Sequence, residues 1–164
     1  MRTTKKTELQ KEKIIARIEK NLGKKIESYE LAELRGTIEA VNKIGIYPKS
    51  GMGTAWGLIL FTKEENNTKA GVYFYYPATE GMFDFFFRQN SGDAPAEDQF
   101  VCLSDMPEIT YETPKKTFFS FLNPDEKRTI FVKAKAGGEE VNFCFMLMEN
   151  RATEVAERLE NSTF

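Results

Sequence analysis

The 164-residue sequence contains no histidine and only two cysteines. Histidine is the usual base beside serine and cysteine nucleophiles and the commonest metal ligand, so its absence excludes those catalytic systems. Cys102 and Cys144 lie far apart in apolar runs, which favours free, buried thiols in a reducing compartment over a disulfide between them. We therefore predict a protein that is not an enzyme and has neither a cofactor nor a metal site.

Long apolar runs are also missing. No stretch approaches the roughly 18 residues that a membrane-spanning helix needs. The opening MRTTKKTELQKEK lacks the apolar segment of a secretory signal, and we predict a cytoplasmic protein.

Aromatic residues, in contrast, are abundant, with 14 Phe, 6 Tyr and 1 Trp. Such side chains bury large areas and favour the pleated surface of a strand, so a β-rich core is expected. Apolar patterning predicts strands at 36–47, 54–62, 70–77, 82–88, 100–105, 117–122, 129–136 and 141–148. We predict an α+β fold, mostly β: an antiparallel barrel of seven to eight strands.

The last strand passes almost directly into an amphipathic helix. Alternate residues form one apolar face (Val141, Phe143, Phe145, Leu147) and one mixed face (Asn142, Cys144, Met146, Met148). Asn150 can cap the helix that follows. Its apolar stripe comprises Ala152, Val155, Ala156 and Leu159. This helix is expected to close the open end of the barrel.

The segments GLILFT and GVYFYYP are similar to the early strands of bacterial PH and GRAM domains, and VNFCFMLMENRATEVAERLE is similar to their closing strand and helix. Over about residues 36–162 the chain thus resembles a pleckstrin-homology-like barrel. The resemblance implies recognition of peptides or lipids. Lipid sites of that family place clustered basic residues in the first hairpin, where this chain offers only Lys43 and Lys49 as a weak anion or lipid site.

We divide the chain into a charged, helical N-terminal arm (residues 1–35) and the barrel domain (36–164). Residues 1–25 carry nine Lys/Arg against three Glu, a net of +6, and the remainder carries 14 against 22, a net of −8. A helix is expected over 7–22, beginning at a Thr7–Gln10 capping box and ending at Gly23. A second short helix is expected over 28–35.

The predicted N-terminal helix separates its charges from its apolar residues. Ile14, Ile15, Ile18 and Leu22 share one face. The opposite face carries five cations, called here the basic ridge: Lys6, Lys13, Arg17, Lys20 and Lys24. The ridge is either the solvent-exposed face of a docked helix or a contact for an acidic partner. Among partners we rank protein first, then an anionic membrane, because the apolar face has no Phe or Trp, and nucleic acid last, because the rest of the chain is acidic.

The leading hypothesis is a non-catalytic binding or adaptor module that recognises a protein partner through this helix and the barrel surface. The alternative is a small-ligand or lipid binder, or an enzyme, with an aromatic-lined barrel cavity, for which Asp84 is the main polar candidate. Other charges are interpreted as solvent-exposed: Arg88, the loop acids Asp93, Glu97 and Asp98, and the lysines and arginine Lys115, Lys116, Lys127, Arg128, Lys133 and Lys135. The oligomeric state is left open.

Overall fold

The computed structural model describes residues 5–46, 53–63, 71–77, 97–106, 108–113, 126–148 and 150–162. The helices are α1 (Lys5–Leu22), α2 (Ile38–Lys43) and α4 (Ala152–Glu160), with 3-10 turns η1 (Leu103–Asp105) and η3 (Glu126–Arg128). The strands are β1 (Lys25–Gly36), β2 (Thr54–Lys63), β3 (Val72–Tyr76), β4 (Gln99–Cys102), β5 (Thr110–Glu112), β6 (Thr129–Ala136) and β7 (Glu139–Leu147). The predicted α+β, mostly β class is confirmed.

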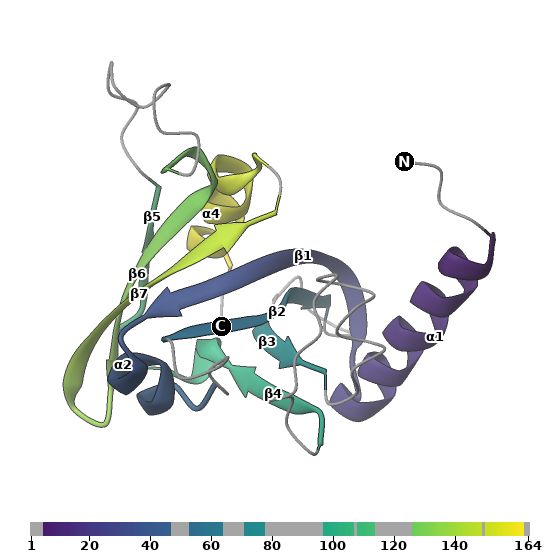
Figure 1. The fold of residues 1–164 in the computed structure, drawn as a ribbon, viewed down its shortest axis with the longest axis horizontal. Coiled ribbons are helices and arrows are strands. Elements are labelled where there is room, and N and C mark those ends of the chain that lie inside the picture. The colour runs from purple at the N-terminus through teal and green to yellow at the C-terminus, as the bar shows by residue number, and fades with distance from the viewer. Residues whose placement is uncertain are drawn as a thin grey trace.

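The seven strands of the described residues form one antiparallel sheet with the order β4-β3-β2-β1-β7-β6-β5. The central strand, β1, pairs with β2 from Lys25 to Arg35, with a register shift between Ile26 and Ser28. It pairs with β7 only over Ala32–Gly36. The strand therefore bends out of one half of the sheet into the other, and the sheet curves into a barrel-like shape (Figure 1).

Aromatic rings fill the concave side of the sheet. The rings of Phe74 on β3 and Phe145 on β7 stack with centroids 5.9 Å apart, and Phe143 meets Phe145 edge-on at 5.6 Å. Gly57 leaves room for this packing, because a Cβ there would lie 2.4 Å from the Phe74 ring. The predicted inward face of β7 is confirmed, since Val141, Phe143, Phe145 and Leu147 are all buried.

Strand β2 is buried at every position from 55 to 62, so both of its faces are covered. Its partners show which face is which: Phe61 lies opposite Ser28, and Leu60 lies opposite Tyr29. Phe61 and Ser28 both contact α4 through Arg158, so they face the concave side. Leu60 must then face the convex side, and two-sided burial explains the continuous apolar run TAWGLILFT.

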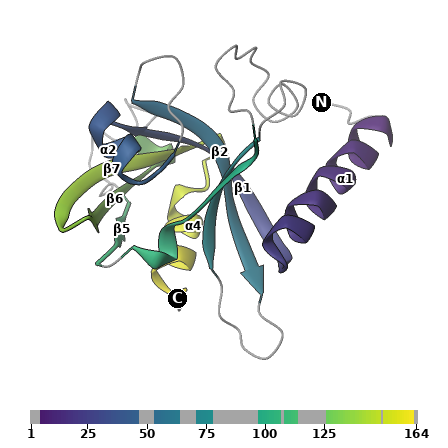
Figure 2. The same cartoon turned by 90° about the horizontal axis from the view of Figure 1, so that it is seen from below.

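Helix α4 packs between the β1–β2 strands and the β5–β7 strands, closing one end of the barrel (Figure 2). Its predicted apolar stripe (Ala152, Val155, Ala156 and Leu159) is confirmed as buried. The predicted cap at Asn150 is wrong. Arg151 occupies the N-cap position without a side-chain cap bond, and its guanidinium pairs with Glu30 on β1 at 2.5 Å.

Two predicted elements near the N-terminus are interchanged. The prediction of a helix over 28–35 is wrong, because these residues form most of β1. The strand expected over 36–47 is also wrong, because α2 occupies its centre. Thr37 caps α2 by accepting a hydrogen bond from Ala40 N at 3.0 Å. Strand β1 runs across the proposed division between residues 35 and 36.

Helix α1 begins at Lys5 rather than Thr7 and ends, as predicted, at Leu22. Gly23 follows it with φ of +67°, the left-handed conformation of a helix terminus. It lies on the side of the β1–β2 pair away from α4 (Figures 1 and 2). The β6–β7 hairpin turns through Gly137 and Gly138. The strands predicted at 82–88 and 117–122 lie outside the described residues, and β5 was not predicted.

Candidate functional site

Helix α1 is docked on the body of the protein. Ile14 and Ile18 are buried in the same apolar cluster as Leu58, Leu60 and Tyr75 from β2 and β3. Ile15 and Leu22 pack against that cluster while keeping some exposure. Because α1 lies on the side of the β1–β2 pair away from α4, the apolar face predicted for this helix meets the convex side of the sheet (Figures 1 and 2). Lys13 and Lys20 of the basic ridge are exposed.

Arg17 fastens α1 to the beginning of β4. One of its guanidinium nitrogens lies 2.8 Å from a carboxylate oxygen of Asp98, whose side chain is 5% exposed while that of Arg17 is 48% exposed. The Tyr75 hydroxyl is influenced by the same carboxylate. Burial, followed by the negative charge of Asp98, raises the pKa of Tyr75 above its usual range. Asp98, predicted to be a solvated loop acid, is thus a buried anchor for the helix.

Lys24, at the other end of the ridge, lies against β3. Its amino group donates a hydrogen bond of 2.6 Å to the Tyr73 hydroxyl and lies 5.3 Å from the centre of that ring. This contact ties the turn after α1 to the sheet. Arg17 and Lys24 therefore serve the docking of α1, which a sequence pattern of like charges does not reveal.

The exposed part of the ridge is smaller than predicted and includes an apolar residue. Lys13 and Lys20 are exposed, and within the described part of the chain their side chains make no hydrogen bond or ion pair. Leu9 precedes Lys13 by one turn and is 53% exposed. These three residues, called here the α1 face, are the candidate site. The Lys6 side chain lies outside the described residues.

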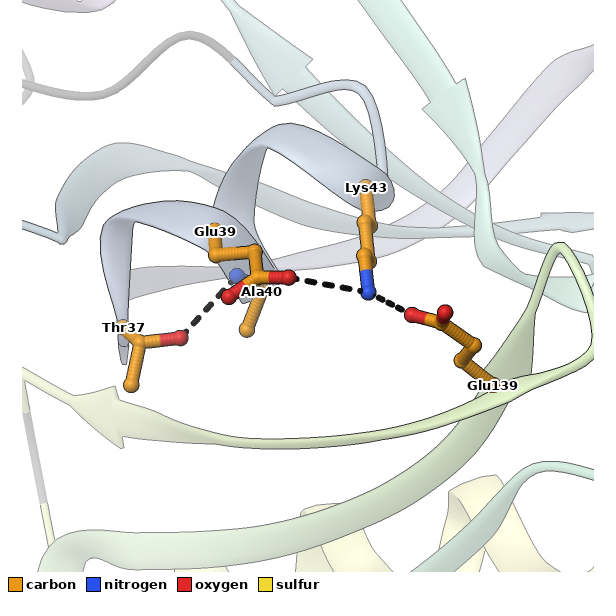
Figure 3. A network of polar contacts seen from close by, with 5 residues as sticks. All are labelled: Thr37, Glu39, Ala40, Lys43 and Glu139. Atoms are coloured by element: carbon orange, nitrogen blue, oxygen red, sulfur yellow. Dashed lines mark hydrogen bonds and ion pairs between the residues drawn. The ribbon is translucent and has the colours of Figure 1, made fainter.

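Lys43, a weak anion-site candidate, lies between two carboxylates (Figure 3). Its amino group is 3.2 Å from Glu39 and also contacts Glu139 on β7. Hydrogen bonds with Glu139 and then Glu39 raise the pKa of Lys43, and the bond from Lys43 lowers the pKa of Glu139. Glu39 and Glu140 also line the adjacent groove of about 240 Å³. Carboxylates thus outnumber the cation here. Lys49 lies outside the described residues.

A second pair of arginine contacts holds α4 on β1. Arg158 lies 3.1 Å from Glu27, donates a hydrogen bond of 2.5 Å to the Ser28 hydroxyl, and stacks over the Phe61 ring at 4.1 Å. With the Arg151–Glu30 pair, these contacts occupy the side of α4 that faces β1. The side of α4 that faces β1 is therefore bridged to that strand by the chain's own side chains.

The remaining candidates are scattered. Asp84, Arg88 and Asp93 lie outside the described residues, and Glu97 is exposed. Both cysteines are free, as predicted, although each is partly exposed rather than buried. None of the helices in the described ranges has the length and apolar composition of a membrane span.

Comparison with protein-family models, with curated proteins and with solved structures found no match to this chain.

Proposed function

We propose that this chain is a non-catalytic binding module, built on a pleckstrin-homology-like barrel, that binds an acidic surface of a partner protein through the α1 face. The strand order and the closing helix support the architectural part of this proposal. Because β1 begins at Lys25, the resemblance would extend further toward the N-terminus than residue 36.

The main support for this function is that some residues of α1 dock the helix while others stay exposed. Ile14, Ile18 and Arg17 hold the helix on the sheet, which leaves Lys13 and Lys20 exposed. A docked helix holds such side chains in a fixed arrangement. Binding of a partner therefore immobilises fewer groups than it would on a free helix. The exposed Leu9 adds an apolar contact, a combination that suits a protein surface better than a bare polyanion.

The alternative of a ligand in an aromatic-lined cavity has less support. Phe74, Phe143 and Phe145, which would line such a cavity, contact one another instead.

The test is a charge reversal that spares the docking contacts. The double variant Lys13→Glu/Lys20→Glu should stay folded and should capture its partner from an extract of the native cells about tenfold less than the unmodified protein. Lys63→Glu, an exposed change at the end of β2, is the matched control and should not alter capture. Retention should fall as salt rises above about 0.15 M, where charges are screened beyond ~8 Å. Equal capture by all three proteins would refute the proposal.

A further inference from the structure

A strip of apolar side chains crosses the convex side of β6 and β7, far from α1. Phe131 on β6 lies directly opposite Cys144 on β7, and Met146 and Met148 continue on the same face at two-residue intervals. Phe131 is 46% exposed and Met148 is 44% exposed, which makes them two of the four large apolar side chains that the described residues leave open. The name β6–β7 strip is used here for Phe131, Cys144, Met146 and Met148.

The thiol in this strip behaves as an apolar group. Burial raises the pKa of Cys144, and the smaller effects of Arg35 and Glu33 oppose one another. The thiol therefore stays neutral at neutral pH and extends the apolar surface between Phe131 and Met146.

Cations without carboxylate partners border the strip. Lys133 follows Phe131 by two residues on the same face, and Lys127 and Arg128 immediately precede β6. All three are exposed, and within the described ranges their side chains make no ion pair. Arg35, directly opposite Cys144 on β1, is paired with Glu33, and Lys43 and Lys135 are also paired with carboxylates. Within the described residues, these three side chains are therefore open to a carboxylate of another molecule.

We propose that the β6–β7 strip is a docking surface for an extended segment of a partner protein that places an apolar side chain on Phe131 and a carboxylate on Lys133. Side chains two residues apart on a strand stand about 7 Å from one another, and an extended peptide repeats that spacing. One pair of alternating residues, apolar then acidic, therefore matches both Phe131 and Lys133. Met146 and Met148 supply an adaptable floor beside them.

A membrane and a second copy of the chain fit this surface less well. Phe131 lies on a sheet face rather than at a projecting tip, so it does not extend toward a bilayer as a membrane anchor does. Two copies meeting strip to strip would bring their cations together. A segment that carries both an acidic and an apolar side chain pairs with the cations at the border and covers the apolar surface of the strip.

This surface is separate from the proposed function on α1. The β6–β7 hairpin and α1 lie at opposite ends of the molecule in both views (Figures 1 and 2). A protein with both contacts can hold two partners at once, as an adaptor does.

The experiment is a selection from a displayed library of random peptides about twelve residues long, with counter-selection on the variant Phe131→Ser/Lys133→Glu. The peptides that remain should combine Asp or Glu with a large apolar residue at alternate positions. In fluorescence anisotropy, Kd for a selected peptide should rise about tenfold or more in each single variant. Lys63→Glu and Lys13→Glu/Lys20→Glu should leave Kd unchanged, which separates this site from the one on α1.

Methyl resonances locate the contact directly. In protein labelled at methionine methyl groups, Met146 and Met148 should shift on titration with a selected peptide. The proposal is overturned if no peptide is enriched, if the enriched peptides lack acidic residues, or if the strip variants bind them normally. It is equally overturned if Phe131 mediates binding to vesicles containing about a third phosphatidylserine, or a concentration-dependent dimer, in place of peptide binding.

Discussion

Arg17 and Asp98 join the N-terminal helix to a strand that lies far away in the sequence, and they differ sharply in exposure. Asp98 is almost fully covered, while half of the Arg17 side chain reaches solvent. A buried carboxylate is stable only while its charge is compensated. The pair therefore matters chiefly because its removal would leave Asp98 without that compensation.

At the residue scale we predict that Arg17→Ala lowers the free energy of unfolding by about 1–2 kcal/mol, since the partial exposure of Arg17 moderates the loss. Lys13→Ala, one turn earlier on the exposed face, should change it by less than about 0.5 kcal/mol. Urea denaturation of the two variants measures the difference. Equal effects would mean that the Arg17–Asp98 contact contributes nothing to the docking of α1.

Among the elements, the strands with alternating or continuous apolar patterns were predictable. Strands β2, β3, β6 and β7 lie close to the predicted ranges because each buries one or both faces, and this burial dictates their composition. Strand β1 was missed because KIESYELAELRG is rich in Glu, Leu, Lys and Ala, which prefer helix. Pairing with β2 and β7 overrides that preference.

Helix α2 was missed although its ends carry recognisable signals. Thr37 caps the helix, and Gly45, with φ of +79°, follows its end. Ala40, Val41 and Ile44 are the buried positions between them, a helical spacing that three positions are too few to establish. A helix this short is hard to recognise from the sequence, because six helical residues give less than two turns of periodicity.

The candidate site was predictable only in outline. The charge separation on α1 identified its exposed side, because the apolar residues had to face the sheet. The roles of Arg17 and Lys24 were not predictable, because their partners Asp98 and Tyr73 are distant in sequence and meet them only through the fold.

A second prediction concerns the contact between α2 and β7. The pKa of Glu139 is lowered by Lys43, so the pair stabilises the fold above the ordinary carboxyl pKa of 4.5, and this contribution is lost as pH falls through the lowered value. The pKa of Lys43 is raised from 10.5, so its contribution is lost only as pH rises through the raised value.

Titration of the Glu139 side-chain carboxyl carbon by NMR should therefore give a midpoint below 4.5 in the native protein. In Lys43→Met the midpoint should return toward 4.5, and in Lys63→Met it should stay where it is in the native protein. An unchanged midpoint in Lys43→Met would show that the contact does not persist in solution.

On the scale of the whole molecule, the part of the sheet around β1 and β2 is covered on both sides, by α4 within the curve and by α1 on the convex face (Figure 2). Leu58, Leu60 and Tyr75 are buried together with Ile14 and Ile18 of α1. The N-terminal helix is therefore part of the core and not an appendage.

We expect a chain lacking residues 1–22 to lose its cooperative thermal transition or to aggregate, because the convex face of β2 and β3 would be uncovered. The charge-reversed Lys13→Glu/Lys20→Glu protein should retain that transition. Near-ultraviolet circular dichroism and sedimentation distinguish the two outcomes. A monomeric truncated protein with an unchanged transition would show that α1 is dispensable for the fold.

The central place of β1 has a consequence for biosynthesis. Arg158 of α4 bonds to Ser28 of β1 across 130 residues of sequence, and β7 pairs with the same strand. At about 5–20 residues per second, a ribosome takes roughly 6 to 26 seconds to make the intervening chain. Until then, one edge of β1 has no neighbour, and nascent chains are open to mispairing with one another or to capture by a chaperone.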